Sequence, residues 1–206
     1  MTRLLENRNA IITGANQGLG LAIAKAYVEA GANIVMCARD GKLLEQAHQD
    51  ISTLATGHEQ KVIAHVGDVS QPEHVKEIVA LAINHFSHLH ILVNNAGIYG
   101  PKGLIEDVDW KEWKQAIEID LMGSVLMCRA VLPHFKANRY GKIVQLSGGG
   151  ATNPLPRFSA YAASKAAIVR FAETLAEEVR DDSIDVNSIA PGALNTRMLD
   201  EALTAG

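Results

Sequence analysis

The sequence predicts an α/β fold in which a doubly wound parallel sheet carries helices on both faces. Short β-branched runs alternate with longer helical patterns along the chain, a glycine-rich turn follows the first run, and polar loops follow later runs. Strict alternation of strand and helix indicates parallel pairing, because parallel neighbours need a crossover connection. Right-handed crossovers then place helices on both sides of the sheet.

The strands are expected at the short apolar, β-branched runs. In chain order these are Asn9–Thr13, Asn33–Cys37, Lys61–Val66, Ile91–Asn94, Lys142–Leu146 and Ile184–Ile189. Ligands in such a sheet bind outside the carboxyl ends of the strands. The loops after the strands should therefore hold the chemistry.

The helices are expected between these strands, where apolar residues recur at helical spacing. In chain order these are Gly18–Ala30, Gly41–Leu54, Pro72–Phe86, about Asp109 to Ala137, and Ser159–Arg180. Pro72 suits a first helical turn, and Ser70 is expected to cap that helix. We see no repeat or linker and expect residues 1–206 to form a single dinucleotide-binding and catalytic domain.

Composition excludes several classes of function. The chain of 206 residues is 48% hydrophobic and 20% charged, which is an ordinary globular balance. Its net charge of −4 gives no reason to expect nucleic acid or an anionic membrane as partner. Apolar runs are too short to cross a membrane, and the start of the chain shows no signal peptide. Cys37 and Cys128 are expected to be buried thiols, so we expect a cytoplasmic protein.

The turn after the first strand has the composition of a phosphate-binding loop. Its sequence is Thr13-Gly14-Ala15-Asn16-Gln17-Gly18-Leu19-Gly20, and it opens a helix. Glycines let backbone N–H groups approach a pyrophosphate, whose charge suits a helix N-terminus. The alternative is a plain glycine-rich turn between a strand and a helix.

Tyr161 and Lys165 lie four residues apart in a predicted helix and therefore share one face. A phenol has a reference pKa of about 10. An ammonium group beside it favours the phenolate, so Lys165 is expected to lower the pKa of Tyr161. The pair could then exchange a proton with a carbonyl or alcohol oxygen.

Four motifs in this order resemble those of the short-chain dehydrogenase/reductase (SDR) family: the glycine turn, Asn94-Asn95-Ala96-Gly97, Tyr161-x-x-x-Lys165 and Pro191-Gly192. The resemblance implies a Rossmann-like sheet, a nicotinamide cofactor, and hydride transfer between it and a carbonyl or secondary alcohol. It implies that Tyr161 is the general acid/base and that Lys165 also binds the nicotinamide ribose. The further cofactor contacts that it implies are Gly14, Asn16, Gln17, Gly18, Leu19, Gly20, Asp68, Val69, Asn95, Ala96, Gly97, Pro191, Gly192 and Thr196.

The end of the second strand bears on the choice of cofactor. Ala38 stands where NAD-type members have a carboxylate, and Arg39 follows it. A guanidinium can pair with a ribose 2′-phosphate, so we expect NADP(H) in preference to NAD(H). Alternatively Arg39 is a solvated loop residue, and Asp40 beside it weakens the positive field.

Two catalytic positions depart from the family pattern. Ser147 lies one residue farther from Tyr161 than the family serine, whose usual place holds Gly148. The adjacent glycines could absorb that shift, so we expect Ser147 to polarise the substrate oxygen. Asp120 stands where the family has Asn, and its carboxylate could raise the pKa of Lys165. A non-catalytic or impaired dinucleotide-binding protein is the alternative function.

Three further expectations concern metals, partners and the end of the chain. The histidines of His85-Phe86-Ser87-His88-Leu89-His90 lack ligand spacing to a cysteine or carboxylate, so no metal is expected. The two longest helices are expected to form a homodimer or homotetramer interface. Family members usually continue into a substrate-covering segment and a further edge strand, so the substrate segment is expected to be incomplete here.

Overall fold

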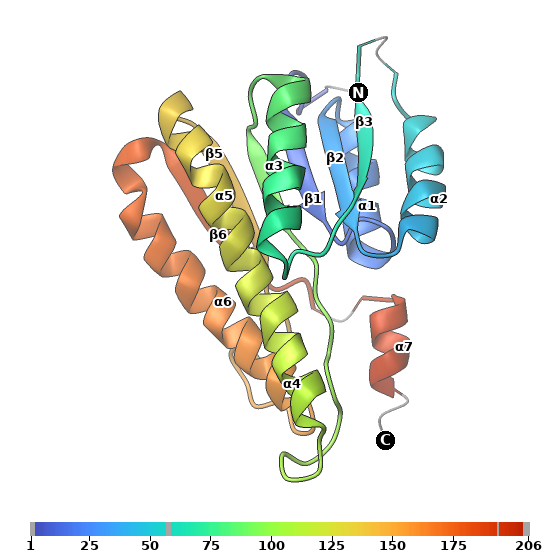
Figure 1. Ribbon diagram of the computed structural model, residues 1–206, viewed down its shortest axis with the longest axis vertical. Helices are drawn as coiled ribbons and strands as arrows, with labels where there is room; N and C mark the ends of the chain where they lie inside the picture. The colour runs from blue at the N-terminus through green and yellow to red at the C-terminus, as the bar shows by residue number, and fades with distance from the viewer. Residues whose placement is uncertain (1–2, 57–58, 193, 204–206) are drawn as a thin grey trace.

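The computed structural model describes residues 3–56, 59–192 and 194–203. Within these residues a six-stranded sheet has the order β3-β2-β1-β4-β5-β6, and every neighbouring pair is parallel (Figure 1). The strands are β1 (Asn9–Thr13), β2 (Asn33–Ala38), β3 (Val62–Val66), β4 (Ile91–Asn94), β5 (Gly141–Leu146) and β6 (Ile184–Ile189). The order reverses between β1 and β4, which confirms the doubly wound α/β fold.

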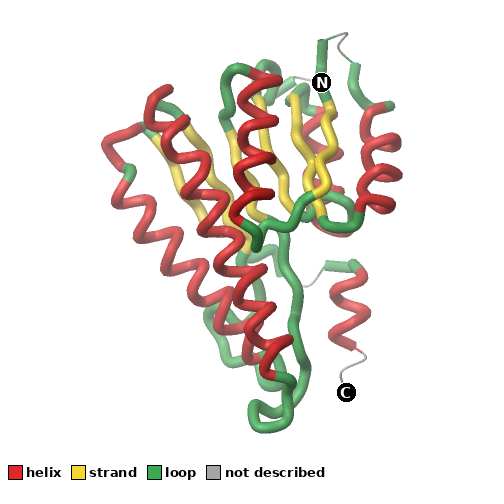
Figure 2. The backbone as a smooth tube through the Cα atoms, in the orientation of Figure 1, coloured by secondary structure: helices red, strands yellow, loops and turns green. Residues whose placement is uncertain are grey.

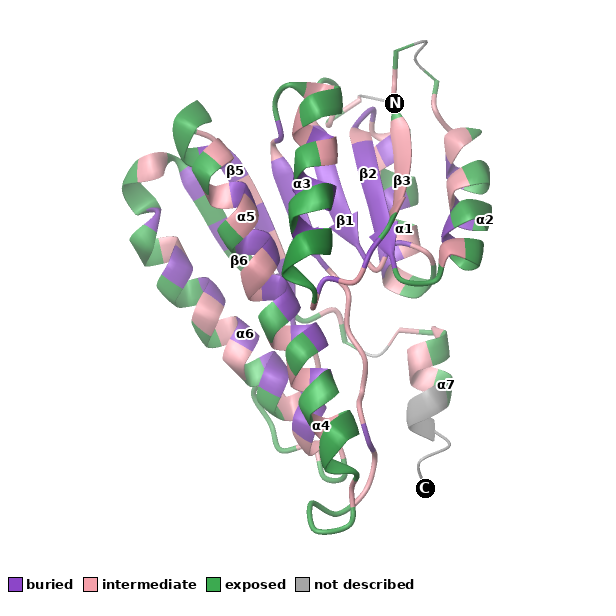
Figure 3. Ribbon diagram, in the orientation of Figure 1, coloured by how far each residue is buried: buried purple, intermediate pink, exposed green. Residues whose placement is uncertain are grey.

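Helices pack on both faces of this sheet (Figure 2). One face is covered by α1 (Gly18–Glu29) and α2 (Gly41–Ser52), and the other by α3 (Pro72–Phe86), α5 (Gly123–Asn138) and α6 (Ser159–Glu178). Figure 3 shows the central strands buried between the two layers. All five residues of β1 are buried, because this strand lies between two neighbours and under both layers.

The outer strand β6 is buried on one face only. Ile184 and Val186 are buried beneath α6, whereas the alternate residues Asp185 and Asn187 are exposed. Within the described ranges no strand pairs with the outer edge of β6. Such an edge leaves backbone N–H and C=O groups unpaired.

The expected long helix exists, but it is interrupted. It consists of α4 (Trp110–Ile117), a π-helical turn (Glu118–Met122) and α5. The N–H of Gly123 donates to the carbonyl of Glu118, five residues back. The expectation of one continuous helix missed this turn, because the segments on each side of the extra residue still have helical spacing. Its consequence is local: Asp120 turns inward and is fully buried.

The cap expected at Ser70 is wrong. Gln71 is the N-cap residue of α3 and makes no side-chain capping bond. The Ser70 hydroxyl donates instead to Asp68 Oδ1 at 2.8 Å, because the loop after β3 makes its own turn around that carboxylate. The remaining bounds agree with expectation or differ from it by one or two residues, and Arg180–Asp182 forms a short 3₁₀ turn after α6.

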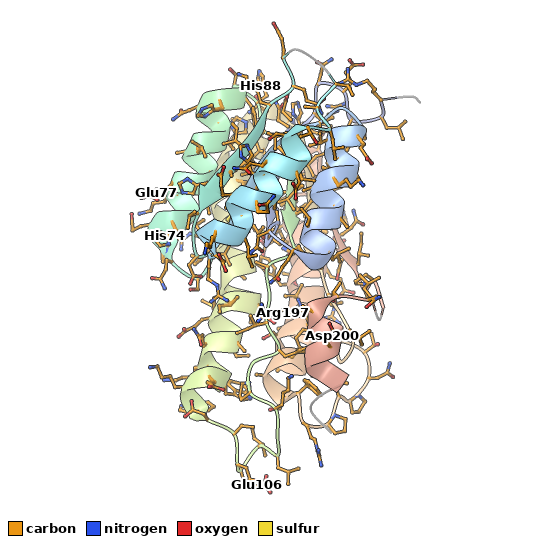
Figure 4. The ribbon with its side chains drawn as sticks, turned by 90° about the vertical axis from the view of Figure 1, so that its right-hand side faces the viewer. His74, Glu77, His88, Glu106, Arg197 and Asp200 are labelled. Atoms are coloured by element: carbon orange, nitrogen blue, oxygen red, sulfur yellow. The ribbon has the colours of Figure 1, made fainter. Side chains whose placement is uncertain are left out.

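The final helix, α7 (Arg197–Leu203), lies below the carboxyl ends of the strands in the view of Figure 1. Figure 4 shows Arg197 and Asp200 at this end of the molecule and His88 at the other. Across the described ranges, no helix combines the length and apolarity that a membrane crossing needs.

Candidate active site at the carboxyl ends of the strands

The glycine turn closes tightly against the end of β4. Gly14 and Gly18 have positive φ angles of 62° and 55°, which glycine adopts without steric cost. A Cβ at Gly20 would lie 2.1 Å from the Gly14 carbonyl oxygen. No residue larger than glycine fits there, so the first turn of α1 can approach the turn that precedes it.

Thr13 and Asn95 join the glycine turn to β4. The N–H groups of Asn95 and Ala96 donate to Thr13 Oγ1 at 2.9 and 3.0 Å. The Asn95 side-chain amide donates to the carbonyls of Thr13 and Gly14 at 2.9 and 3.1 Å. The amide of Asn95 thus holds the glycine turn against the end of β4.

The residues of the turn fit the pyrophosphate of a dinucleotide. The N-cap of α1 is Gln17, whose backbone is extended and whose side chain makes no capping bond. The first N–H groups of α1 therefore donate no capping bond to the side chain of Gln17. A helix N-terminus with uncapped N–H groups favours binding of an anion. Thr196 approaches from the far end of the chain, and its Cγ2 would lie 3.5 Å from a Cβ at Gly18.

The end of β2 presents a cation. The Arg39 guanidinium lies 4.0 Å from Asp68 Oδ2, and both side chains are partly exposed. Asp40 Oδ1 accepts from the N–H groups of Lys42 and Leu43, each at 3.0 Å, so this carboxylate caps α2. Asp40 therefore stabilises the N-terminus of α2.

Val69 and the proline-glycine loop lie at opposite sides of this region. Val69 is buried against α5, where a Cβ at Gly123 would lie 2.6 Å from its Cγ2. Its expected contact with an adenine ring stays a prediction. Pro191 is half-buried, and Gly192 is exposed with a φ of 76°. Their expected contact with the nicotinamide also stays a prediction.

Tyr161 and Lys165 converge as the four-residue spacing predicts. Both are buried on α6, and Lys165 Nζ lies 5.4 Å from the centre of the Tyr161 ring. Nζ donates to the Leu146 carbonyl at the end of β5, at 2.9 Å. A Cβ at Gly97 would lie 3.4 Å from Lys165 Nζ, which places the pair beside the loop that also contacts the glycine turn.

Asp120 meets this pair from the π turn. Its Oδ1 accepts from the Ile98 N–H at 2.8 Å and would lie 3.3 Å from a Cβ at Gly97. Its Oδ2 is buried without a hydrogen-bond partner among the described residues. Gly97 therefore lies close to both a buried carboxyl group and a buried ammonium group.

Burial dominates the protonation of this cluster. Burial, with smaller effects of the same sign from Tyr99 and Asp120, raises the pKa of Tyr161 to about 12. Burial lowers the pKa of Lys165, which Asp120 opposes, and raises the pKa of Asp120 to about 6. The expected lowering of the Tyr161 pKa is thus wrong for the protein alone, because desolvation of the phenolate prevails and the ammonium is directed at Leu146.

Gly148 faces the phenol and Ser147 does not. A Cβ at Gly148 would lie 2.3 Å from Tyr161 Oη. Ser147 is buried, and its hydroxyl is 3.4 Å from the Lys165 carbonyl oxygen. The one-residue shift noted in the sequence therefore persists in space, and a polarising role for Ser147 stays a prediction that this geometry does not favour.

Sequence reasoning missed Tyr99. Its ring is 4.8 Å from the Tyr161 ring and 5.0 Å from that of Phe158. The available signal was its place in the loop after β4, at the carboxyl edge of the sheet. Phe158, directly before α6, lies in the same aromatic group.

The histidines lie at the opposite end of the sheet. The His88 ring is 6.5 Å from that of His90 and 6.4 Å from that of His134. His90 Nδ1 accepts from the Asn9 N–H at 3.1 Å, and His134 Nε2 accepts from the Leu89 N–H at 3.0 Å. The described residues contain no group of three or more His, Cys, Asp or Glu side chains suited to a metal ion.

Comparisons with known proteins agree with this geometry. The family described as short chain dehydrogenase matches residues 8–205. Dehydrogenase/reductase SDR family member 7B of Rattus norvegicus is 33% identical over 203 residues, which are 98% of this chain and 62% of that protein. The chain therefore spans less than two thirds of the length of that relative.

Two solved structures resemble the fold closely. Levodione reductase has a TM-score of 0.93 at 28% identity, over 98% of this chain and 77% of its own. The 3-ketoacyl-(acyl-carrier-protein) reductase from Brucella melitensis, complexed with NADH, has a TM-score of 0.88 at 32% identity, over 95% and 80%.

The parallel sheet, its reversal at β1 and the glycine turn define a Rossmann-like protein of the dinucleotide-binding class. Within that class the chain belongs to the short-chain dehydrogenase family, whose members are oxidoreductases that use NAD(H) or NADP(H).

Proposed function

We propose that the protein is an NADP(H)-preferring oxidoreductase that interconverts a carbonyl compound and a secondary alcohol. The observation that carries the proposal is the convergence of Tyr161 and Lys165 beside Gly97, on the loop that Asn95 ties to the glycine turn. When bound, the nicotinamide supplies or accepts the hydride.

Tyr161 is the proton donor in the direction of reduction. With a pKa of about 12 its phenol is neutral at physiological pH and can donate a hydrogen bond, then a proton, to a carbonyl oxygen. Lys165 fixes the end of β5 through the Leu146 carbonyl and provides the nearby positive charge. That charge stabilises the phenolate left after proton transfer, and Asp120 supports the ammonium form of Lys165.

Substitution of the phenol tests the catalytic assignment. Tyr161→Phe removes the proton donor while keeping the ring, so turnover should fall by about 10²-fold or more. The measurement is the nicotinamide absorbance change with a panel of ketones and alcohols. Tyr140→Phe, at the histidine end of the sheet, is the matched control and should keep normal turnover. Full turnover by Tyr161→Phe would overturn the assignment.

The preference for NADP(H) is supported by Arg39 and by the engagement of Asp40 in the cap of α2. Arg39→Ala should weaken NADP(H) binding by about 10-fold or more and leave NAD(H) binding nearly unchanged, since a charge-assisted pair contributes about 1.5–3 kcal/mol. Calorimetric titration of both dinucleotides measures this. Lys76→Ala, an exposed cation on α3, should change neither affinity. Equal losses for both dinucleotides would contradict the preference.

A second candidate function is dinucleotide binding without catalysis. It is supported by Gly148, which leaves Tyr161 without a serine hydroxyl beside it, and by the burial of Ser147. This alternative predicts tight dinucleotide binding in the calorimeter together with no turnover of any carbonyl or alcohol in the panel.

Assembly and location also stay predictions. A homodimer or homotetramer would bury the outer faces of α5 and α6, where Arg170 and Glu173 are exposed.

The two buried free thiols, Cys37 and Cys128, are compatible with the cytoplasmic location expected from the sequence.

A further inference from the structure

The catalytic phenol occupies space that a side chain would otherwise fill. A Cβ at Gly148 would lie 2.3 Å from Tyr161 Oη and 3.2 Å from Cζ, so only a hydrogen fits between the two residues. Residue 148 therefore provides no serine hydroxyl that could donate a hydrogen bond to a substrate oxygen at Tyr161.

The hydroxyl groups of Ser147 and Ser159 are directed away from Tyr161 Oη. The Ser147 hydroxyl lies 3.4 Å from the Lys165 carbonyl oxygen. The Ser159 hydroxyl accepts from the indole N–H of Trp113 at 3.0 Å. Tyr161 thus polarises a carbonyl group without the second side-chain hydroxyl that Ser147 was expected to provide.

The loss of one such donor has a known size. A preorganised hydrogen bond to a developing oxyanion contributes about 10²- to 10³-fold in rate. In a ketone with an electron-withdrawing neighbour, that neighbour stabilises the negative charge that develops on the carbonyl oxygen. Reduction of such a ketone therefore depends less on a second hydrogen-bond donor. An isolated ketone has no such compensation.

The surface beside the phenol is aromatic. Tyr99 lies edge-on to Tyr161 with an interplanar angle of 62°, and its ring also contacts that of Phe158. Tyr99 and Phe158 are only partly buried, and Lys102 Nζ lies 5.8 Å from the centre of the Tyr99 ring. Flat conjugated groups pack favourably on such rings.

We propose that this site selects electron-poor aryl carbonyl compounds, namely aryl α-diketones and quinones, over isolated ketones. The proposal rests on the oxidoreductase function proposed above. Reduction of a diketone adds a hydride to one carbonyl carbon, breaks its C=O π bond and leaves the electron pair on oxygen. Tyr161 protonates that oxygen, and the reduced dinucleotide is the two-electron donor that becomes oxidised.

The first experiment compares an aryl α-diketone with the aryl monoketone of the same carbon skeleton. The wild-type protein should reduce the diketone with a kcat/KM at least about 10²-fold higher, as the missing donor requires. Equal values for the two substrates would overturn the substrate class while leaving the proposed function intact. No turnover of either substrate, with the dinucleotide bound, would overturn the proposed function as well.

Variants separate this selection from the intrinsic reactivity of the diketone. Gly148→Ser should lower the ratio of kcat/KM for the diketone to kcat/KM for the monoketone by about 10-fold or more, chiefly by raising kcat/KM for the monoketone. Gly148→Ala introduces the same Cβ beside Tyr161 without a hydroxyl and should not narrow it. Gly149→Ser is the matched control, because a Cβ there meets no atom within 4 Å. An unchanged ratio in an active Gly148→Ser variant would overturn the proposal.

A binding measurement remains decisive if every variant at position 148 is inactive. Calorimetric titration of a quinone into the protein with oxidised dinucleotide should show about 10-fold weaker affinity for Tyr99→Leu. Tyr99→Phe keeps the ring and should bind normally. Equal affinity for wild type and Tyr99→Leu would overturn the aromatic part of the proposal.

Discussion

Asp120 is a carboxyl group with no solvent exposure, and its protonation state is set by competing forces. Burial disfavours the charged form, whereas Lys165, the Ile98 N–H and Arg39 favour it. The net pKa of about 6 means that this carboxyl group changes charge just below physiological pH. An asparagine at this position would not titrate, so the substitution relative to the family pattern introduces a pH dependence.

Asp120→Asn tests this at the residue scale. Above a pH of about 6 the carboxylate supports the Lys165 ammonium; below it that support is lost. Because the charge of Asp120 acts on both Lys165 and Tyr161, wild-type kcat should show an inflection near pH 6 that the Asn variant lacks. The measurement is kcat against pH with saturating dinucleotide. Identical profiles would show that Asp120 does not titrate in the working enzyme.

The same pKa makes a statement about stability. Because the folded-state pKa of Asp120 lies above its ordinary value of 3.8, ionisation disfavours folding. The stability that the protonated Asp120 side chain contributes is complete below a pH of about 4 and decreases as pH rises through about 6. The free energy of unfolding of Asp120→Asn should lack this decrease, which is a readout independent of activity.

At the scale of elements, α5 rests on β5 through a contact that demands glycine. Phe135 is fully buried, and a Cβ at Gly141 would lie 2.3 Å from its Cδ2. The first residue of β5 therefore fixes how closely the helix approaches the sheet. The π turn upstream on the same helix directs Asp120 toward Gly97, so packing along α5 and the geometry of the site depend on one segment.

Gly141→Ala should lower the free energy of unfolding by about 1–3 kcal/mol, because an overpacked core must displace the Phe135 ring. Urea denaturation measures the change. Gly149→Ala, in open space, is the matched control and should shift it by less than about 0.5 kcal/mol. A change of less than about 0.5 kcal/mol in the free energy of unfolding of Gly141→Ala would contradict this prediction. It would mean that α5 and Phe135 can move to accommodate the methyl group without loss of stability.

At the scale of the whole molecule, the two ends of the sheet respond to pH differently. The candidate active site lies at the carboxyl end of the strands, and His90 and His134 lie at the amino end. Figure 4 labels His88, whose ring neighbours both of these histidines. Burial lowers the pKa of both His90 and His134, with further lowering of His90 by Arg8 and by neighbouring histidines, and of His134 by His88. Each ring accepts a backbone N–H through one nitrogen, which protonation would abolish.

The stability contributed by these rings is therefore complete above a pH of about 6.5 and decreases as pH falls below it. His134→Gln offers the Leu89 N–H an acceptor that does not titrate, so its unfolding free energy should decrease less between pH 7 and 5 than that of the wild type. Urea denaturation across this range measures both proteins. Parallel curves would show that His134 is not responsible.

Much of this arrangement could be read from the chain. Periodic apolar residues and the turn glycines predicted every strand and helix on the sheet, because these signals are local. The spacing of Tyr161 and Lys165 predicted their common helix face for the same reason. The π turn, the capping role of Asp40 and the contact of Tyr99 with Tyr161 were not predictable, since each depends on segments that meet only after folding.

The sequence by itself determined the class of fold and which residue types stand at the carboxyl ends of the strands. The tertiary structure alone decided the protonation and surroundings of those residues. There burial raises the pKa of Tyr161, and Gly148 rather than Ser147 faces the phenol. The reason is physical: local spacing selects helices and strands, whereas desolvation and close approach depend on the packed environment around each atom.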